Sequence, residues 1–436
     1  MIGVVNNMNK RPYRRTSAPG GPWYEYYGTV CPICGNDGMC MIHEDQNRVI
    51  CCRMESKIPW AKNSSLPGWL HYLEDDNRPT IQIDEIQAEN NNNKKSDAEL
   101  NRVYQALLSE LKMTKQHVEQ LTGPTRQLTL NQILFRKYKS FPEKPWQVVK
   151  SVISRVGEAE DLIGVPGFYL KEGTNNKYMT MKGIKNSLLI PFRNIKNEIV
   201  GFQYRVDKVQ NKAVTKQIDN KLSAYVKQQP NIVVVKYDDS VIFEGEMPVG
   251  EWKNFIHNNK TVGAVKIKKG TRYIWLSSAS EEGGTGAGPL PVHVSIPSDQ
   301  LKNWKTGTVL KKDTVWLTEG PLKADISSDL LEIMYRDEEM ENLGDTFLSI
   351  PGVNSWRLIL PILKEMGVKR VIIAFDMDAV SNPDVKFHLT ECMQGLKDEN
   401  YTIDFSFWNE KEGKGIDDLL LKNIIPVVKR VYNAQK

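Results

Sequence analysis

Three short acidic signatures lie between residues 313 and 420: VWLTEGPLKAD (315–325), VIIAFDMDA (371–379) and GKGIDDLL (413–420). In each of the first two signatures, an apolar run ends abruptly in a carboxylate. Runs that are apolar on both faces, with helical segments between them, are typical of buried parallel strands. The stretch therefore predicts an α/β domain built on a parallel sheet.

Four strands are predicted in this domain, and helices starting at Pro321, Ser355 and Pro383 are expected to connect them through right-handed crossovers. The chain is expected to end shortly after a final pair of helices. The predicted strands are TVWLT (314–318), TFLSI (346–350), RVIIAF (370–375) and IDFSFW (403–408).

Carboxylates follow these strands where a ligand is expected. In open α/β sheets, ligands bind beyond the carboxyl ends of the strands, so Glu319, Asp376 and Asp378 are predicted to share one crevice. Three neighbouring carboxylates raise one another's pKa values unless a cation holds them. Their oxygens suit Mg²⁺ or Mn²⁺. Asp417 is a further candidate, although either Asp417 or Asp418 can instead cap the last amphipathic segment.

A cysteine cluster lies near the start of the chain, where five of the six cysteines fall within residues 31–52. Clustering of this kind in a reducing compartment indicates a metal site rather than disulfides. A redox Cys-x-x-Cys pair is the alternative, but it lacks a βαβ context and leaves the other cysteines unexplained. Four thiolates form a closed, structural Zn²⁺ site. The expected ligands are Cys31, Cys34, Cys40 and Cys51, with Cys52 or His43 as possible replacements.

Composition describes a globular protein of two or three domains. The chain has 436 residues, 40% hydrophobic and 25% charged residues, and a net charge of +5. Because this charge is small, affinity for nucleic acid must come from local patches. We find no apolar run of membrane-spanning length and no signal peptide, so we expect a cytoplasmic protein without membrane contact.

The middle of the chain supplies further basic groups. Residues 74–99 contain an Asn run without apolar periodicity and predict a flexible linker. Short helices follow, with Thr114 and Thr129 as caps. The Lys-rich stretch KIKKGTR (266–272) is either a solvated strand edge or a contact for a nucleic-acid backbone. Lys323 lies one helical turn beyond Glu319 and can hold a phosphate.

The acidic signatures, taken together with the CPxCG turn, resemble the zinc-finger TOPRIM-domain DNA primases of bacteria and phages, in the variant found in mobile elements. The resemblance implies primer synthesis on single-stranded DNA from nucleoside triphosphates by two-metal nucleotidyl transfer. It gives Glu319, Asp376, Asp378 and Asp417 catalytic roles. The hairpin SLLIPFRN–IVGFQYRVD resembles the basic subdomain of these primases, which makes Arg193 and Arg205 nucleotide- or template-binding candidates.

The predicted organisation is multidomain, α+β and α/β. A zinc-ribbon-like module with a basic arm (1–73) and a linker (74–99) precede a mixed α/β basic domain (100–312) and a Rossmann-like TOPRIM domain with a four-stranded parallel sheet (313–436). We expect a monomer that works in phage or plasmid replication, with any replicative helicase as a separate partner. A TOPRIM nuclease and a non-catalytic, zinc-containing DNA-binding replication protein are the alternatives.

Overall fold

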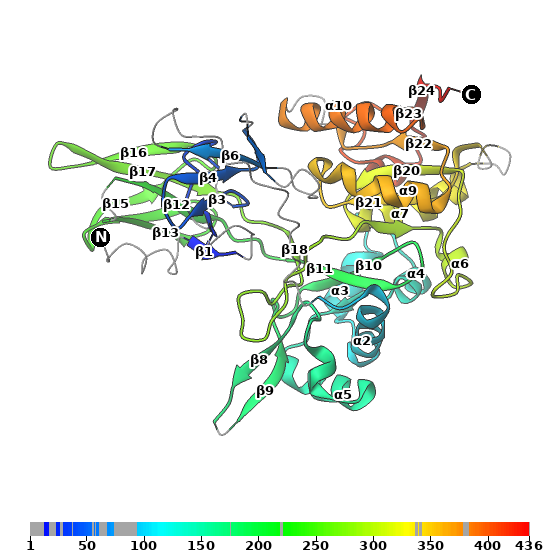
Figure 1. The fold of residues 1–436 in the computed structure, drawn as a ribbon, viewed down its shortest axis with the longest axis horizontal. Helices are drawn as coiled ribbons and strands as arrows, with labels where there is room; N and C mark the ends of the chain where they lie inside the picture. The colour runs from blue at the N-terminus through cyan, green and yellow to red at the C-terminus, as the bar shows by residue number, and fades with distance from the viewer. Residues whose placement is uncertain are drawn as a thin grey trace. The chain divides into compact units, whose positions relative to one another are not determined.

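The structure is a computed structural model, and it describes two compact units of the chain (Figure 1). One unit comprises Met1–Asn91 and Lys208–Arg272, and the other Asn92–Asp207 and Tyr273–Lys436. Within the described ranges, no helix has both the length and the apolar character needed to cross a bilayer. The described residues are 13–16, 23–26, 29–36, 38–54, 56, 58–60, 68–73, 94–174, 176–218, 221–335, 339, 342–377 and 383–435.

A six-stranded sheet in the order β19–β21–β20–β22–β23–β24 forms the centre of the second unit. Its four inner strands are the four predicted ones, and they run parallel. Both edge strands are antiparallel and were not predicted. The strands are β19 (His293–Ser295), β20 (Thr314–Glu319), β21 (Phe347–Ile350), β22 (Arg370–Ile373), β23 (Thr402–Phe407) and β24 (Val427–Tyr432).

Helices cover both faces of this sheet and make a three-layer arrangement. On one face, α7 and α11 pack against Trp316, Phe347 and Ile372. On the other face, η2, α9 and α10 enclose a larger apolar core that contains Leu317 and Ile373. The helices are α7 (Pro321–Met334), η2 (Val353–Leu358), α9 (Ile359–Met366), α10 (Pro383–Asp398) and α11 (Ile416–Leu420).

Two predictions for this domain need correction. The helix expected from Ser355 begins as the 3-10 helix η2 at Val353 and becomes α-helical only at Ile359. The chain ends in a strand rather than in a second helix, because β24 pairs with β23 and partly buries Val428 against the core. The adjacent Lys429 and Arg430 place charge on this edge strand, which disfavours pairing with another chain.

The remainder of the second unit packs helices against the sheet β18–β11–β10–β7. Thr114 and Thr129 cap α3 and α4 as predicted. The predicted linker ends earlier than expected, because α2 starts at Asp97, while residues 74–93 lie outside the described ones. The helices are α2 (Asp97–Glu110), α3 (Lys115–Thr122), α4 (Leu130–Arg136), α5 (Pro145–Val156), η1 (Ala159–Leu162) and α6 (Ser298–Leu301). The strands are β7 (Lys139–Ser140), β8 (Phe168–Glu172), β9 (Lys177–Met181), β10 (Leu188–Arg193), β11 (Ile199–Arg205) and β18 (Tyr273–Trp275).

The first unit consists of strands. Its N-terminal part is the antiparallel sheet β1–β2–β3–β4–β6–β5 around the cysteines. Residues 208–272 form two three-stranded sheets, so the structure divides the single domain predicted for 100–312. The N-terminal strands are β1 (Tyr13–Arg15), β2 (Trp23–Tyr26), β3 (Met41–His43), β4 (Arg48–Cys51), β5 (Pro59–Trp60) and β6 (Gly68–Tyr72). The others are β12 (Lys212–Gln217), β13 (Leu222–Gln228), β14 (Ile232–Tyr237), β15 (Ser240–Glu246), β16 (Trp252–His257) and β17 (Lys260–Lys268).

A buried ion network joins α4 to α7 in the second unit. The guanidinium of Arg136 donates to Asp325 at 2.5 Å and pairs with Asp329 at 2.9 Å. The second oxygen of Asp325 accepts the hydroxyl of Tyr138, and His293 lies 3.0 Å from the first. Burial by itself raises the pKa of Asp325, but Arg136 and His293 outweigh it and lower that pKa. Asp325, which had no role assigned from sequence, therefore fixes the position of α7.

Replacing Asp325 by Asn should lower the free energy of unfolding by about 3–5 kcal/mol at pH 7, because the buried Arg136 loses its partner. Since folding lowers the pKa of Asp325, this contribution is complete above the unfolded value of about 3.9 and is lost below it. Urea unfolding from pH 7 to pH 3 should show the difference between wild type and variant narrowing as the pH falls. Asp299→Asn, at an exposed ion pair, should change stability by less than about 0.5 kcal/mol. Equal effects of the two substitutions would contradict the assignment.

Candidate functional site

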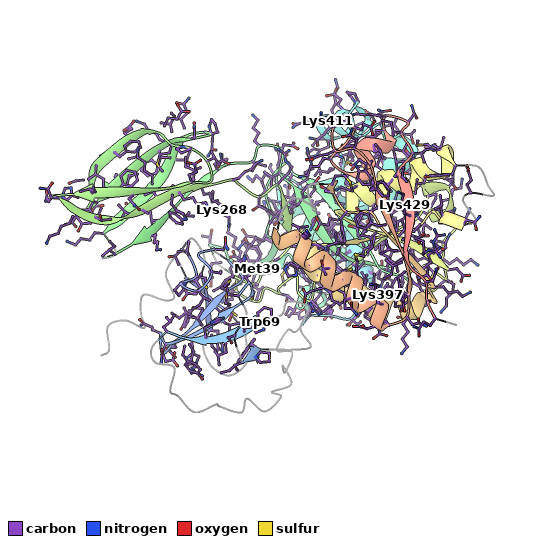
Figure 2. The ribbon with its side chains drawn as sticks, turned by 90° about the horizontal axis from the view of Figure 1, so that it is seen from above. Met39, Trp69, Lys268, Lys397, Lys411 and Lys429 are labelled. Carbon is purple, nitrogen blue, oxygen red and sulfur yellow. The ribbon has the colours of Figure 1, made fainter. Side chains whose placement is uncertain are left out.

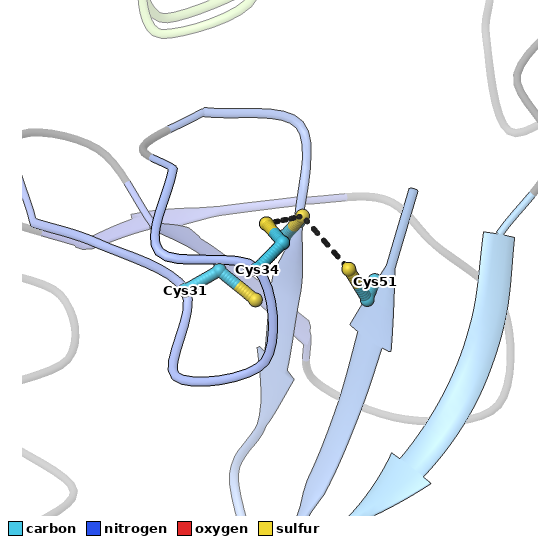
Figure 3. A group of neighbouring side chains, drawn as sticks. Cys31, Cys34 and Cys51 are labelled. Carbon is cyan, nitrogen blue, oxygen red and sulfur yellow. Dashed lines mark hydrogen bonds between the residues drawn. The ribbon is translucent and has the colours of Figure 1, made fainter. Parts of the chain in front are cut away.

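Four cysteines of the N-terminal sheet converge on one point (Figure 3). The sulfur atoms of Cys31, Cys34, Cys40 and Cys51 all lie within 4.8 Å of one another. Cys31 and Cys34 belong to a turn before β3, Cys40 directly precedes β3, and Cys51 ends β4. The hairpin pairing of β3 with β4 therefore brings the two halves of the cluster together. Four thiolates at this spacing are the donor set of a structural zinc site.

The surroundings of the cluster fit a cation. The sulfur of Cys40 accepts the N–H of Cys52 and the guanidinium of Arg53, each at 3.4 Å. Such outer hydrogen bonds hold thiolate ligands in place. Among the thiols alone, hydrogen bonds lower the pKa of Cys40 and raise that of Cys31. The thiols thus compete for one negative charge, whereas Zn²⁺ would stabilise four.

Neither alternative ligand joins the cluster. The thiol of Cys52 donates to the carbonyl of Met39 at 3.3 Å. His43 faces Arg48, whose Nη2 lies 2.8 Å from its Nδ1, and the ring of His43 packs edge-on against Trp23. The cluster consists of the four predicted cysteines.

The acidic residues lie at the carboxyl end of the parallel strands in the second unit. Glu319 ends β20, and its Oε1 accepts the N–H of Val353, the first residue of η2, at 2.6 Å. Asp376 follows β22, and Asp417 lies in the first turn of α11. Asp378 lies outside the described residues, so its role stays a prediction.

Lys323 is the group around which these acids gather. Its ammonium forms an ion pair with Asp376. Burial lowers the pKa of Lys323, while Asp417, Glu319 and Asp418 act in the opposite direction. Carboxylates from three segments of the chain are therefore within electrostatic reach of one partly buried cation.

Asp417 is the most deeply buried of these acids, with 3% of its surface exposed. Its Oδ2 accepts a hydrogen bond from Arg126 at 2.7 Å. Burial raises the pKa of Asp417, although Lys323 and Arg126 oppose that shift. A Cβ added at position 415 would lie 2.7 Å from Asp417 Oδ1 and 2.9 Å from Lys323 Nζ, so a larger residue there would displace these two groups.

The carboxylates have the chemistry of a divalent-metal site, but Lys323 now supplies the positive charge. Among the residues that the structure describes, only the four cysteines bring three or more possible ligand atoms within 4.8 Å of one another. Glu319, Asp376 and Asp417 do not form such a cluster. Their oxygens nevertheless suit Mg²⁺ or Mn²⁺. The residues fit a hard cation that shares the acids with Lys323 or displaces it.

A cavity of about 430 Å³ lies next to the acidic edge. Asp418 and the three lysines Lys411, Lys414 and Lys422 contribute to its lining. Figure 2 labels Lys411. The ammonium of Lys414 is also 4.0 Å from Asp376, so the cavity and the acidic edge share a residue. Glu410 also lines the cavity, so its three lysines exceed its two acids by one charge, and this excess favours an anionic ligand.

The two predicted hairpin arginines have different surroundings. Arg193 is 4% exposed, and its guanidinium donates to Asn197 at 2.6 Å and to the carbonyl of Phe135 at 3.1 Å. Burial lowers its pKa to about 10. This position holds β10 against the end of α4 and leaves no surface for a template. Arg205 is partly buried, 3.3 Å from Asp207.

Two contributors to the acidic site were not predicted. Lys414 lies inside the third signature, so the sequence carried a signal for it beside Gly415. Arg126 lies 291 residues before Asp417, in a loop without any distinguishing pattern. Only the fold brings Arg126 to the site.

Comparison with known families gives one match. The family described as a domain of unknown function (DUF3854) matches residues 304–425. This range contains all three acidic signatures. No curated protein matches the chain.

Solved structures of bacterial primase domains are among those that resemble this chain. The DnaG primase catalytic domain bound to single-stranded DNA is 11% identical, with 74% of this chain and 75% of that chain covered and a TM-score of 0.37. The Aquifex aeolicus primase, with zinc-binding and RNA polymerase domains, is 10% identical, with 97% and 83% covered and a TM-score of 0.40. The RNA polymerase domain of Mycobacterium tuberculosis DnaG is 12% identical, with 75% and 80% covered and a TM-score of 0.41.

Removing one cysteine of the cluster should remove the metal and unfold the N-terminal sheet. Cys51→Ser is expected to lower bound zinc from one ion per chain to less than about 0.1, because loss of a thiolate costs a large part of a folding free energy on the order of 10 kcal/mol. Elemental analysis and limited proteolysis of the full chain measure both effects. Cys52→Ser is the matched control and should keep its zinc. Loss of zinc in both variants, or in neither, would reject the four-cysteine assignment.

Proposed function

We propose that the chain is a DNA primase of the TOPRIM kind, which synthesises short oligonucleotide primers on single-stranded DNA by nucleotidyl transfer. The observation that carries the proposal is the gathering of Glu319, Asp376 and Asp417 around Lys323 at one edge of a parallel sheet. Ligands of open α/β sheets bind at this edge. The acidic signatures that place these residues there also resemble those of TOPRIM primases.

The acids have an electrostatic role in this proposal. Bound Mg²⁺ or Mn²⁺, as two ions, would lower the pKa of the primer 3′-hydroxyl and neutralise the charge of the triphosphate. Glu319, Asp376 and Asp378 would hold these ions, and Asp417 would complete the set. Arg126 orients Asp417 and opposes the rise in the pKa of Asp417 that burial causes. The protein thus contributes fixed charge rather than a covalent intermediate.

The lysines complete the site for a nucleotide. A cation held by Asp376 would take the place of Lys323 in its ion pair, and the ammonium of Lys323 would then be available to a phosphate oxygen. Lys411, Lys414 and Lys422 line the adjacent cavity and balance the charge of a triphosphate. An incoming nucleoside triphosphate therefore meets positive charge on two sides.

The other parts of the chain have supporting roles in the proposal. The zinc module and its basic arm would contact the template strand. The helical and strand-rich part of the second unit would position the template beside the acids, with Arg205 as the candidate contact from the hairpin. We propose a monomeric enzyme that acts in phage or plasmid replication, with any helicase as a separate protein.

Replacing Asp376 by Asn should lower primer synthesis by about 10²–10³-fold or more, because an amide keeps the shape of the side chain but removes the charge that holds the cation. The assay supplies single-stranded DNA, all nucleoside triphosphates and Mg²⁺ or Mn²⁺, and separates the labelled products by length. Asp398→Asn, which makes the same change at an exposed position at the end of α10, should retain full activity.

The products of this assay also distinguish a primase from a nuclease and from a non-catalytic DNA-binding protein. Wild-type protein that shortens the template without adding nucleotides would be a nuclease. Binding of the template without any new or shortened strand would indicate a non-catalytic replication protein. Full primer synthesis by Asp376→Asn would refute the role given to the acidic edge.

A further inference from the structure

Residues 208–272 form a separate β module that enters the chain between two paired strands. β11 and β18 are antiparallel neighbours, and Arg205 pairs with Tyr273. The chain therefore leaves and re-enters the second unit at adjacent points. The module has its own apolar core, to which Val233 and Val235 of one sheet and Val265 and Ile267 of the other contribute.

The module carries an excess of positive charge. Its sequence contains twelve Lys or Arg residues and six Asp or Glu residues, a surplus of six, whereas the whole chain has a net charge of +5. The remainder of the chain therefore has a net charge of −1. The positive character of this protein is concentrated in 65 residues.

The register of the sheet β12–β17–β16 shows where this charge lies. In an antiparallel sheet, residues directly opposite one another point to the same face. Val265 and Ile267 face the core, so the alternate positions of β17 face outward. On the central strand β17, the outward residues are Ala264, Lys266 and Lys268. Their neighbours on β12 are Lys216, Val214 and Lys212, in that order. On β16, Asn254 lies opposite Ala264 and Trp252 lies opposite Lys266.

We call this outward surface of β12, β16 and β17 the lysine face. None of its three strands contains Asp or Glu. Lys212 and Lys216 are exposed, and Lys266 is half-buried. Figure 2 labels Lys268 at the end of β17. Four lysines thus share one face without any acid on the same strands.

The other sheet of the module is different. On β13–β14–β15, Lys227 forms an ion pair with Glu244, and Lys221 lies 3.2 Å from Asp238. Acids on these strands and turns balance much of the lysine charge. The strands β12, β16 and β17 carry six lysines and no acid, whereas β13, β14 and β15 carry two lysines and two acids, so the excess of positive charge lies on the first sheet.

An aromatic ring lies within the lysine face. Trp252 is 38% exposed, and the ammonium of Lys266 lies 5.9 Å from its ring centroid. The ammonium of Lys266 lies over this ring, and the exposed part of the ring adds an apolar surface to the lysine face. Lysines that attract a phosphate backbone, with an aromatic ring on which a base can stack, are the combination that binds single-stranded nucleic acid.

We infer that the lysine face of the inserted module binds the backbone of a single-stranded nucleic acid, with Trp252 stacking on a base. A solvated sheet face is the simpler interpretation of scattered surface lysines. The absence of acids on all three strands and the position of the ring favour a polyanion instead. The inference is independent of primer synthesis, because none of its residues belongs to the acidic edge.

The test compares the full chain with its K212A/K216A/K266A variant. Binding of a fluorescein-labelled oligothymidylate of about 20 nucleotides, longer than the ~4–16 nucleotides covered by one OB-fold module, is followed by anisotropy between about 50 and 200 mM salt. We expect at least about tenfold weaker binding at the lower salt concentrations. The slope of log affinity against log salt should fall by about 2, since each phosphate contact on a single strand contributes about 0.7.

The matched control is K221A/K227A/K236A, which removes the same charge from the sheet β13–β14–β15 and should change affinity by less than about twofold. K212R/K216R/K266R should bind like wild type, which separates lost charge from lost folding.

Trp252→Ala should remove the preference for single strands over duplex. Equal losses in the two alanine triples, or an unchanged slope in K212A/K216A/K266A, would overturn the inference. An unchanged strand preference in Trp252→Ala would overturn the stacking role. K212A/K216A/K266A keeps every residue of the acidic edge and the assay contains no nucleoside triphosphate, so failure of this inference is distinct from failure of the proposed catalysis.

Discussion

The arrangement of the second unit depends on a charge constraint at one edge of its sheet. Parallel strands end at a common edge, so the residues that follow β20 and β22 must be neighbours. Here those residues are Glu319 and Asp376, and α11 adds Asp417. Uncompensated carboxylates at a partly buried edge would raise one another's pKa values and destabilise the fold. The partly buried ammonium of Lys323 offsets part of this cost, because it pairs with Asp376 and opposes the rise in the pKa of Asp417.

The position of Lys323 is in turn fixed by the opposite side of the same helix. Residues two apart on an α-helix point about 200° from each other, so Lys323 and Asp325 face different neighbours. Asp325 and Asp329, which lie four residues apart on one face, hold Arg136 of α4. α7 therefore carries its lysine to the acidic edge while a buried network prevents it from rotating. Precise placement of one charged group is what electrostatic catalysis requires.

The sequence predicted the elements whose signals are local. The four inner strands, the caps at Thr114 and Thr129 and the four-cysteine cluster all rest on patterns within a few residues. The edge strands β19 and β24 are short or polar and acquire their structure only by pairing with the sheet. The contact between Arg126 and Asp417 joins segments 291 residues apart and has no local signal. For Arg193 the local sequence was misleading. A basic residue at the end of a strand is expected to be exposed, but α4 buries Arg193 in the structure.

The positive charge of the chain and the acidic edge lie in different parts of the sequence. At the acidic edge, the four carboxylates of Glu319, Asp376, Asp417 and Asp418 outnumber the cations of Lys323, Lys414 and Arg126 that pair with them. The inserted module has the opposite character, and it contains more than the whole net positive charge of the chain. Its entry between β11 and β18 leaves the host sheet intact, because the two strands pair whether the connection is short or long. Affinity for a strand can therefore be supplied by the module without placing a competing cation among the acids, where it would occupy the position that a metal ion or Lys323 must hold.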